Sequence, residues 1–373
     1  MSRDGSFTTP PEGLAEAVLP TTDLTKDLAF FTGGLGFRLE KIFPSDNPAV
    51  AVLYGHGLRI RLTGSRPGPG GVLRILSSAP HQLAGGETEL VSPGGTKIKI
   101  RENAPHLAPI ERQSEASFQA LGGPEDWTVG RAGMLYRDLL PGRLQGSMIA
   151  SHIRIPQGGP VPDMVHFHTV RFQLIYCARG WVRLVYEDQG PPFILSAGDC
   201  VTQPPEIRHR VLEASDNLEV VEIGVPADHI TTIDHGLDLP TPLREPDRRF
   251  AGQVFCHHQV EKARWVPWRL PGFEARETGV AAASGGLAGV MVARPRGESS
   301  AIEFRHGADL HFSFILSGGL TVDCQGEEPH KLSAGDSFSL PPDQTHRFHD
   351  WSPDLELLEV TLPDDFEITN RSL

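Results

Sequence analysis

The stretch LSAGDCVTQPPEIRHRV, residues 195–211, returns later in the chain as LSAGDSFSLPPDQTHRF, residues 332–348. Each copy has an SAGD turn, a Pro-Pro pair and a histidine four residues after the second proline. Self-similarity of this kind indicates an internal duplication. The apolar runs around both copies are short, rich in β-branched residues and separated by turn residues, which favours β-strands. We therefore expect a mainly β fold with two tandem jelly-roll barrels.

Length and composition limit the kind of protein. The 373 residues predict two or three domains, and a formal net charge of -13 with scattered basic residues argues against nucleic acid or an anionic membrane as partner. The N-terminal MSRDGSFTTPPEG lacks the apolar core of a signal peptide, and no apolar run approaches the roughly 20 residues that span a bilayer. The four cysteines form no CxxC pair, which suits reduced thiols. We expect a soluble, cytoplasmic protein that binds a small molecule.

The first hundred residues differ from the rest. The stretch LAEAVLPTTDLTKDLAFFTGGLGFRLEKIF, residues 14–43, predicts a strand, a capped helix and a second strand, and AVAVLYG and LRIRLTG extend this to a β-α-β-β-β order. The segment 238–250 is rich in proline and charge, as linkers are. We expect a small α+β module at 1–107, a linker at 108–128, a barrel at 129–237, a linker at 238–262 and a barrel at 263–373.

The first barrel contains a cluster of candidate metal ligands. In a strand, the period of two places His166 and His168 on one face, and His209 lies beyond the SAGD turn on a later strand. Three imidazoles can hold one face of a divalent metal and leave positions open for substrate, O2 or water.

The spacing G-x6-HFH-x4-Q-x6-G, followed by G-x5-P-x3-RH, resembles the two sequence motifs of the cupin superfamily. The duplication, over about residues 130–365, resembles a bicupin. The resemblance implies that His166, His168 and His209 are metal ligands, and that Gln173 stands where the family usually has a ligating Glu. We expect Gln173 to be a weak fourth ligand or a catalytic partner that orients substrate or O2. Because the amide is neutral, the metal would keep its positive charge, which favours an anionic, chelating substrate.

The second barrel has a modified ligand set. Aligning Gly318 with Gly180 places Phe304, His306, His311 and His346 at the positions of His166, His168, Gln173 and His209. His306, His311 and His346 are therefore candidate ligands of a second, weaker metal site. The alternative is a barrel that has lost its metal and serves packing and dimerisation.

Other residues carry weaker signals. Arg154 could reach an anionic substrate, and Cys177, which shares strand parity with Gln173, could face the barrel interior. Four histidines outside the motifs are expected at the surface: His257, His258, His330 and His349.

The N-terminal module resembles one half of a vicinal-oxygen-chelate, or glyoxalase-like, domain through VLPTTDLTKDLAFFTGGLGFRLE and SPGGTKIKI. In that family one metal ligand would fall near Glu16, and a second would fall at Lys99. A charged lysine cannot ligate a metal. We expect a metal-free, non-catalytic module.

These features predict a metal-dependent dioxygenase, an oxidoreductase that acts on an enolate, diketone or catechol-like substrate. Fe(II) is the expected ion, with Mn, Ni, Cu or Zn as alternatives, and the expected assembly is a homodimer. Two other functions stay open: a non-redox isomerase, cyclase or lyase, in which the metal acts as a Lewis acid, and a non-catalytic small-molecule-binding bicupin. O2 uptake distinguishes the first function from the other two.

Overall fold

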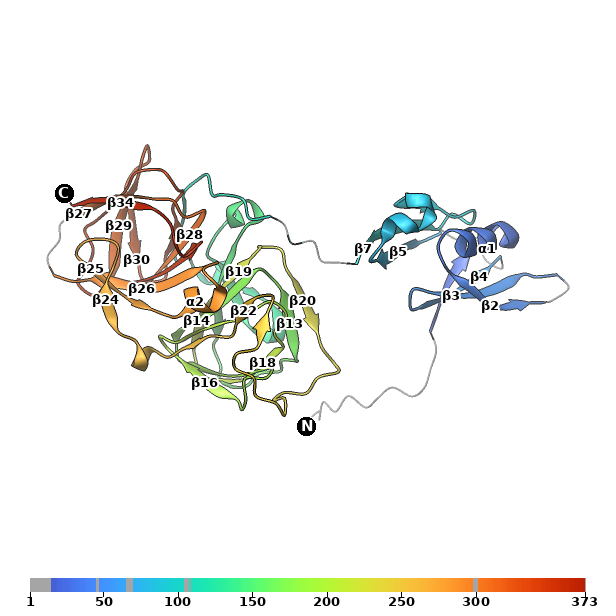
Figure 1. The fold of residues 1–373 in the computed structure, drawn as a ribbon, viewed down its shortest axis with the longest axis horizontal. Helices are drawn as coiled ribbons and strands as arrows, with labels where there is room; N and C mark the ends of the chain where they lie inside the picture. The colour runs from blue at the N-terminus through green and yellow to red at the C-terminus, as the bar shows by residue number, and fades with distance from the viewer. Residues whose placement is uncertain are drawn as a thin grey trace. The chain divides into compact units, whose positions relative to one another are not determined.

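The computed structural model describes residues 15–44, 47–64, 70–103, 107, 109–297 and 301–372 (Figure 1). The chain divides into two compact units, residues 1–106 and 107–373. The segment MSRDGSFTTPPEG, whose composition argued against a signal peptide, lies outside the described residues. Within the described ranges, no helix has the length and apolar character needed to cross a membrane.

The first unit has the β-α-β-β-β order expected from the sequence. Its first sheet has the strand order β1-β4-β3-β2, in which β1 and β4 are parallel. The side chain of Asp23 caps α1 by accepting a hydrogen bond from the Lys26 N–H, and Phe31 on α1 is fully buried. The elements are β1 (Glu16–Pro20), α1 (Leu24–Gly33), β2 (Arg38–Phe43), β3 (Val50–Gly55) and β4 (Leu58–Thr63). A three-stranded sheet follows, made of β5 (Val72–Ser77), β6 (Glu89–Val91) and β7 (Lys97–Glu102).

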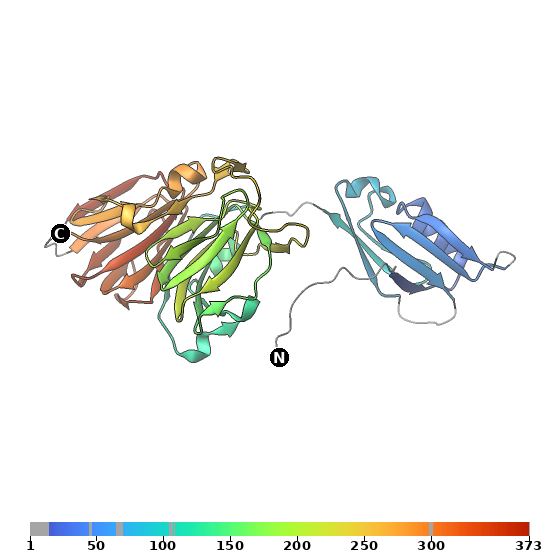
Figure 2. The ribbon, with the colours of Figure 1, turned by 90° about the horizontal axis from the view of Figure 1, so that it is seen from below.

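The second unit consists of two β-barrels that lie side by side, as the two views show (Figures 1 and 2). The first barrel has a seven-stranded sheet of order β23-β17-β14-β19-β11-β10-β9. Its strands are β9 (Thr128–Val129), β10 (Leu135–Asp138), β11 (Ile149–Ile155), β14 (Phe172–Arg179), β17 (Cys200–Thr202), β19 (Leu218–Val225) and β23 (His257–His258). The facing sheet contains β12 (Gly159–Pro160), β13 (His166–Thr169), β15 (Trp181–Tyr186), β16 (Phe193–Ser196), β18 (His209–Ala214) and β20 (Ile230–Ile233).

The second barrel repeats this arrangement. Its seven-stranded sheet has the order β24-β25-β26-β33-β28-β31-β8. The strands are β8 (Ser117–Gln119), β24 (Trp265–Pro267), β25 (Phe273–Glu277), β26 (Gly289–Pro295), β28 (Leu310–Ser317), β31 (Ser337–Ser339) and β33 (Glu356–Leu362). The facing sheet contains β27 (Ala301–His306), β29 (Gly319–Cys324), β30 (His330–Ser333), β32 (His346–His349) and β34 (Ile368–Ser372), and a short helix, α2 (Val280–Ser284), precedes β26.

The repeated SAGD turn has the same structure in both barrels. Gly198 and Gly335 have φ values of 91° and 93°, a region that L-residues with a Cβ rarely adopt. The Asp199 carboxylate accepts a hydrogen bond from the Ser196 N–H, and the Asp336 carboxylate accepts one from the Ser333 N–H. The turn therefore requires both its glycine and its aspartate.

The two segments expected as linkers contain strands. β8, within 108–128, pairs with β31 of the second barrel, although it precedes the first barrel in the sequence. β23, within 238–262, pairs with β17 of the first barrel, and β21 (Arg249–Phe250) and β22 (Gln253–Val254) form a small hairpin before it. Each barrel thus completes its sheet with a strand that lies outside the expected barrel range.

The barrels also share a hydrophobic core. One cluster of buried side chains combines residues of both seven-stranded sheets, among them Phe172 and Ile223 with Phe312 and Val360, all at 0% exposure. Separate clusters fill the interior of each barrel. Because apolar burial is the main stabilising contribution to folding, the shared core ties the barrels together.

Candidate metal centre

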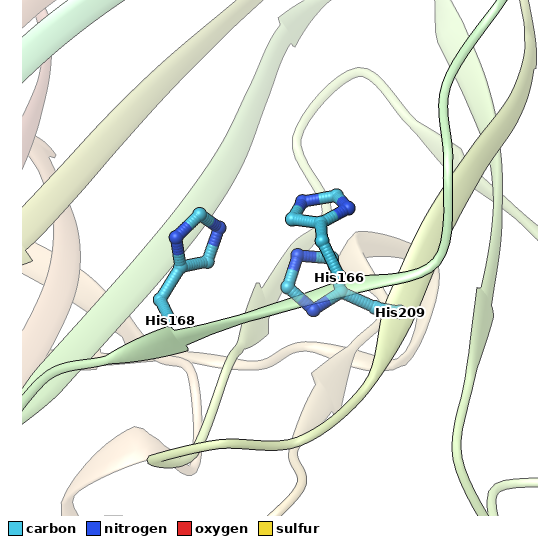
Figure 3. Close-up of side chains that lie close together, drawn as sticks. All are labelled: His166, His168 and His209. Atoms are coloured by element: carbon cyan, nitrogen blue, oxygen red, sulfur yellow. The ribbon is translucent and has the colours of Figure 1, made fainter. Parts of the chain in front are cut away.

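Three histidines of the first barrel lie close together (Figure 3). His166 and His168 come from β13, and His209 comes from β18, where it pairs directly with His166. One ligand nitrogen of each ring lies within 4.8 Å of the others, and the three are 0%, 7% and 3% exposed. The structure therefore brings together the three residues expected as metal ligands.

Hydrogen bonds to carbonyl oxygens fix which nitrogen of His166 and of His209 is free. His166 Nδ1 lies 2.7 Å from the Met164 carbonyl oxygen, and His209 Nδ1 lies 2.9 Å from that of Ile207. A carbonyl only accepts, so each Nδ1 carries the proton and each Nε2 has a lone pair. His168 Nδ1 contacts the Thr231 hydroxyl at 2.9 Å. His166 Nε2 is buried without a hydrogen-bond partner, which a metal ion would provide.

The protonation state of the rings also suits a metal. Burial is the main cause that lowers the pKa of all three rings: to about 2 for His168, well below 6.5 for His209, and below 6.5 for His166. His166 further disfavours a proton on His168 and on His209, and His168 disfavours one on His209. Neutral imidazole is the form that binds a metal, so the site is prepared for a cation at neutral pH.

Gln173 lies beside a carboxylate that the sequence analysis missed. Its Nε2 donates to Glu222 Oε1 at 2.7 Å, and its Oε1 is buried without a partner. Because a carboxylate only accepts, the amide nitrogen has to face Glu222, and the carbonyl oxygen is the free atom. Glu222 is on β19, one strand away from Gln173 on β14. Glu222 therefore places a carboxyl group beside Gln173, which the sequence analysis did not take into account.

The cavity inside the first barrel includes His168, His209 and Glu222 in its lining. Its walls are mostly apolar, and contributors include Ile153, Ile175, Val182, Leu184, Leu218 and Val220. Tyr186 stacks near His209, with ring centroids 5.4 Å apart, and accepts a hydrogen bond from Gln203. Among the described residues that line the cavity, Arg131 is the only Lys or Arg, and it forms an ion pair with the buried Asp163.

Arg154 is not part of this site. Its neighbours Ile153 and Ile155 line the cavity, so strand alternation directs Arg154 to the other face of the sheet. There it donates to Glu219 at 2.9 Å and lies over the Trp127 ring. Cys177 is fully buried in the core of the first barrel, where burial raises its thiol pKa to about 12, and it does not line the cavity.

The histidines of the second barrel occupy the expected positions but do not form a ligand set. Phe304 pairs with His346 as His166 pairs with His209. His346 Nε2 donates to the Pro341 carbonyl, and its Nδ1 contacts Cys324 Sγ. His311 Nδ1 accepts from the Leu340 N–H, which leaves the proton on Nε2. In the described part of the chain, the first-barrel trio is the one group of three or more His, Cys, Asp or Glu that could hold a metal.

His306 is the exception within the second barrel. It is 4% exposed, and neither of its ring nitrogens has a hydrogen-bond partner. It lies near His311 and His346, with ring centroids 5.2 and 5.7 Å away. One free imidazole does not make a facial set of three ligands.

The remaining candidates lie elsewhere. Glu16 forms an ion pair with Arg61 at 2.7 Å, and Lys99 is exposed on β7. The four histidines expected at the surface are less exposed than predicted: His258 is buried, and His257, His330 and His349 are partly buried. The reason is that β23 and β30 are sheet strands that place His258 beside β17 and His330 on the Phe118 ring.

Comparison with known proteins identifies the fold. A family model described as the cupin domain matches residues 290–360. The second barrel is a cupin domain. The structure also resembles salicylate 1,2-dioxygenase of Pseudoaminobacter salicylatoxidans in its adducts with gentisate, with 14% identity, a TM-score of 0.51, and 71% of this chain and 88% of that chain covered.

A second similar structure is oxalate decarboxylase of Bacillus subtilis, a protein with Mn(II) centres. It has 13% identity and a TM-score of 0.51, over 70% of this chain and 80% of that chain. At this identity the likenesses show the fold alone, which is two tandem cupin barrels after a small α+β unit. No curated protein sequence matches the chain.

Proposed function

We propose that this bicupin is a metal-dependent dioxygenase whose ion is held by His166, His168 and His209. The observation that carries the proposal is the set of three buried, neutral imidazoles whose Nδ1 atoms all have partners, which leaves their Nε2 atoms for the metal. Fe(II) is the proposed ion. Such an ion would supply a site for a chelating substrate and the one-electron chemistry that O2 requires.

Residues of the first barrel would determine the polarity and the hydrogen bonds around the substrate. The free Oε1 of Gln173 can accept a hydrogen bond or act as a fourth ligand, because Glu222 holds the amide nitrogen. The apolar walls exclude water and fit the body of the substrate. Tyr186 and Gln203, joined by their own hydrogen bond, support the ring of His209.

The cavity favours one kind of substrate over another. The salicylate dioxygenase acts on an aromatic ring, whereas oxalate is a small dianion with no apolar part. The cavity here is lined mainly by apolar side chains, and the charge of Arg131 is already balanced by Asp163. This supports an enol, diketone or catechol-like substrate with an apolar body. The N-terminal unit supplies no ligand in this proposal, and its proposed role is non-catalytic.

The test measures metal content and O2 uptake in the same samples. The parent protein, His166→Ala and His81→Ala are loaded with Fe(II) without air and then given O2 with catechol, gentisate or acetylacetone. His81 is an exposed histidine of the first unit and serves as the control. We expect metal and O2 uptake in the parent and in His81→Ala, and neither in His166→Ala. Unchanged metal content in His166→Ala would refute the ligand assignment, and metal without O2 uptake would refute the dioxygenase.

A further inference from the structure

The second barrel has a cavity of its own where β27 ends and β34 begins. His306, the last residue of β27, pairs with Ile368, the first residue of β34. The lining of this cavity includes His306 and the segment 365–367 that leads into β34. None of its lining residues also lines the cavity of the first barrel. The two cavities are therefore separate.

His306 brings unused hydrogen-bonding capacity to this cavity. The side chain is buried, and neither ring nitrogen has a hydrogen-bond partner among the described residues. The neighbouring rings do not supply one, because His346 Nε2 donates to the Pro341 carbonyl and His311 Nδ1 accepts from the Leu340 N–H. A buried polar group without a partner is costly. A molecule in the cavity can supply the partner that the protein does not.

The charged side chains of the lining have an excess of negative charge. Arg112 forms ion pairs with Asp309 and Asp343, so its own charge is balanced. Asp365 and Glu367 are exposed, and neither forms an ion pair with another described residue. In total, two arginines face four carboxylates: Arg112 and Arg305, with Asp309, Asp343, Asp365 and Glu367. This balance favours a cationic ligand over an anionic one.

Phe366 lies between these two carboxylates and beside the imidazole. Its ring centroid is 6.1 Å from that of His306, with the ring planes at 72°. Arg269 lies 5.1 Å from the same ring, but it forms an ion pair with the buried Glu359, so its charge does not offset the carboxylates of the lining. Phe366 thus gives the cavity an apolar wall next to His306.

We propose that this cavity binds a small organic cation that has a primary ammonium group and a hydroxyl group, as in a short amino alcohol. The ammonium group lies beside Asp365 and Glu367, and the hydroxyl group forms a hydrogen bond with the free imidazole of His306. A hydroxyl suits this ring because it both donates and accepts. Phe366 contacts the carbon chain that joins the two groups. The site needs no metal and is independent of the function proposed for the first barrel.

The test compares three probes of similar size that differ in charge. Ethanolamine, ethylene glycol and glycolate are titrated into the full chain by calorimetry. Ethanolamine should bind most tightly and glycolate most weakly. His306→Leu should weaken ethanolamine binding by more than about tenfold, because the buried hydrogen bond is lost.

Three further proteins locate the site. Glu367→Gln should weaken ethanolamine binding by about two- to fivefold, as expected for an exposed charge. Glu328→Gln, which changes an exposed carboxylate outside the cavity, should match the parent. His166→Ala should also match the parent, since the first-barrel site takes no part in this binding.

A second measurement does not depend on the folding of a variant. In the parent labelled with ¹⁵N-histidine, ethanolamine should shift the ring-nitrogen resonances of His306 and leave those of the exposed His81 unchanged. Equal affinity of the parent and His306→Leu, glycolate binding as tight as that of ethanolamine, loss of binding in His166→Ala, or no shift at His306 would each overturn the inference.

Discussion

The two barrels have the same strand order and turns, yet among the described residues only the first barrel brings together three histidines that could hold a metal. In the first barrel, His209 donates from Nδ1 to the Ile207 carbonyl and keeps Nε2 free. In the second, His346 donates from Nε2 to the Pro341 carbonyl and uses Nδ1 to contact Cys324. The comparison shows that a histidine at the repeated position does not always leave the same nitrogen available, because the hydrogen bonds around the ring decide which one is free.

The residue that pairs with each histidine on the adjacent strand contributes to this difference in the hydrogen bonds of the ring. Tyr186 pairs with His209, and Cys324 pairs with His346 at the corresponding position. The large Tyr186 ring stacks near His209 and offers no hydrogen bond to it, whereas the small Cys324 thiol lies 3.6 Å from His346 Nδ1. The residue across the ladder therefore helps to set the orientation of the imidazole.

The largest expected difference concerns metal binding. His209→Ala should lower metal affinity by more than about 100-fold, beyond the effect of losing a residue that only orients a ligand. His346→Ala should leave the metal content unchanged, because neither nitrogen of His346 is free. Elemental analysis of the two purified variants, each folded by circular dichroism, measures this. Loss of metal from His346→Ala would mean that the second barrel also holds an ion.

The next largest difference concerns two carboxylates at corresponding positions of the two barrels, Glu222 and Glu359. Arg269→Met should destabilise the protein by about 3–5 kcal/mol, because it leaves the buried Glu359 without its cation. Glu222→Gln should cost less than about 1 kcal/mol, since no ion pair is broken. Urea denaturation of each variant tests this. The double variant Arg269→Met/Glu359→Gln should recover most of the loss, and its failure to do so would show that Arg269 acts through packing.

Acid should affect the second barrel through His306. Burial lowers the pKa of His306 from 6.5 to about 3, so the unfolded chain binds a proton that the folded chain does not. Stability that is present above pH 6.5 is therefore lost as the pH falls, by about 1.4 kcal/mol per pH unit for this group.

The matched variant is His306→Leu, which removes the titrating ring without breaking a hydrogen bond. Denaturation of metal-free protein between about pH 6 and pH 4 should show a slope that is smaller by about 1.4 kcal/mol per pH unit than in the parent. Parallel slopes would show that His306 is protonated in the folded protein.

The smallest expected effect belongs to Gln173→Glu. The new carboxylate would lie within hydrogen-bond distance of Glu222, and two such carboxylates share a proton because one pKa is strongly raised. Metal affinity at neutral pH should therefore change by less than about tenfold, and should rise with pH. Metal titrations at several pH values measure this. A large, pH-independent gain would show that the two carboxylates ionise independently.

The sequence predicted the barrels and the clustering of His166, His168 and His209 because both follow from local patterns. The repeated SAGD turn and the HFH alternation each lie within a few residues. Glu222 was missed because its contact with Gln173 joins residues 49 apart across two strands. The proton positions of His311 and His346 were also out of reach, since they depend on backbone partners that no spacing reveals.

The two strands outside the expected barrel ranges, β8 and β23, were missed for a related reason. β8 and β23 are only 3 and 2 residues long, so they carry no alternating pattern that the sequence could show. Their pairing depends on the open sheet edges that β31 and β17 provide. The polar composition that predicted linkers at 108–128 and 238–262 belongs to the residues on either side of these short strands.

The pairing of β8 with the second barrel and of β23 with the first determines how the second unit can be divided. A fragment that ends before β23 leaves the edge of β17 unpaired, and a fragment that starts after β8 leaves the edge of β31 unpaired. Both fragments would also expose the core the barrels share. Exposed edges and apolar surface promote association between chains. Each half expressed alone should therefore aggregate, whereas the two halves produced together, with the chain cut between β23 and β24, should assemble.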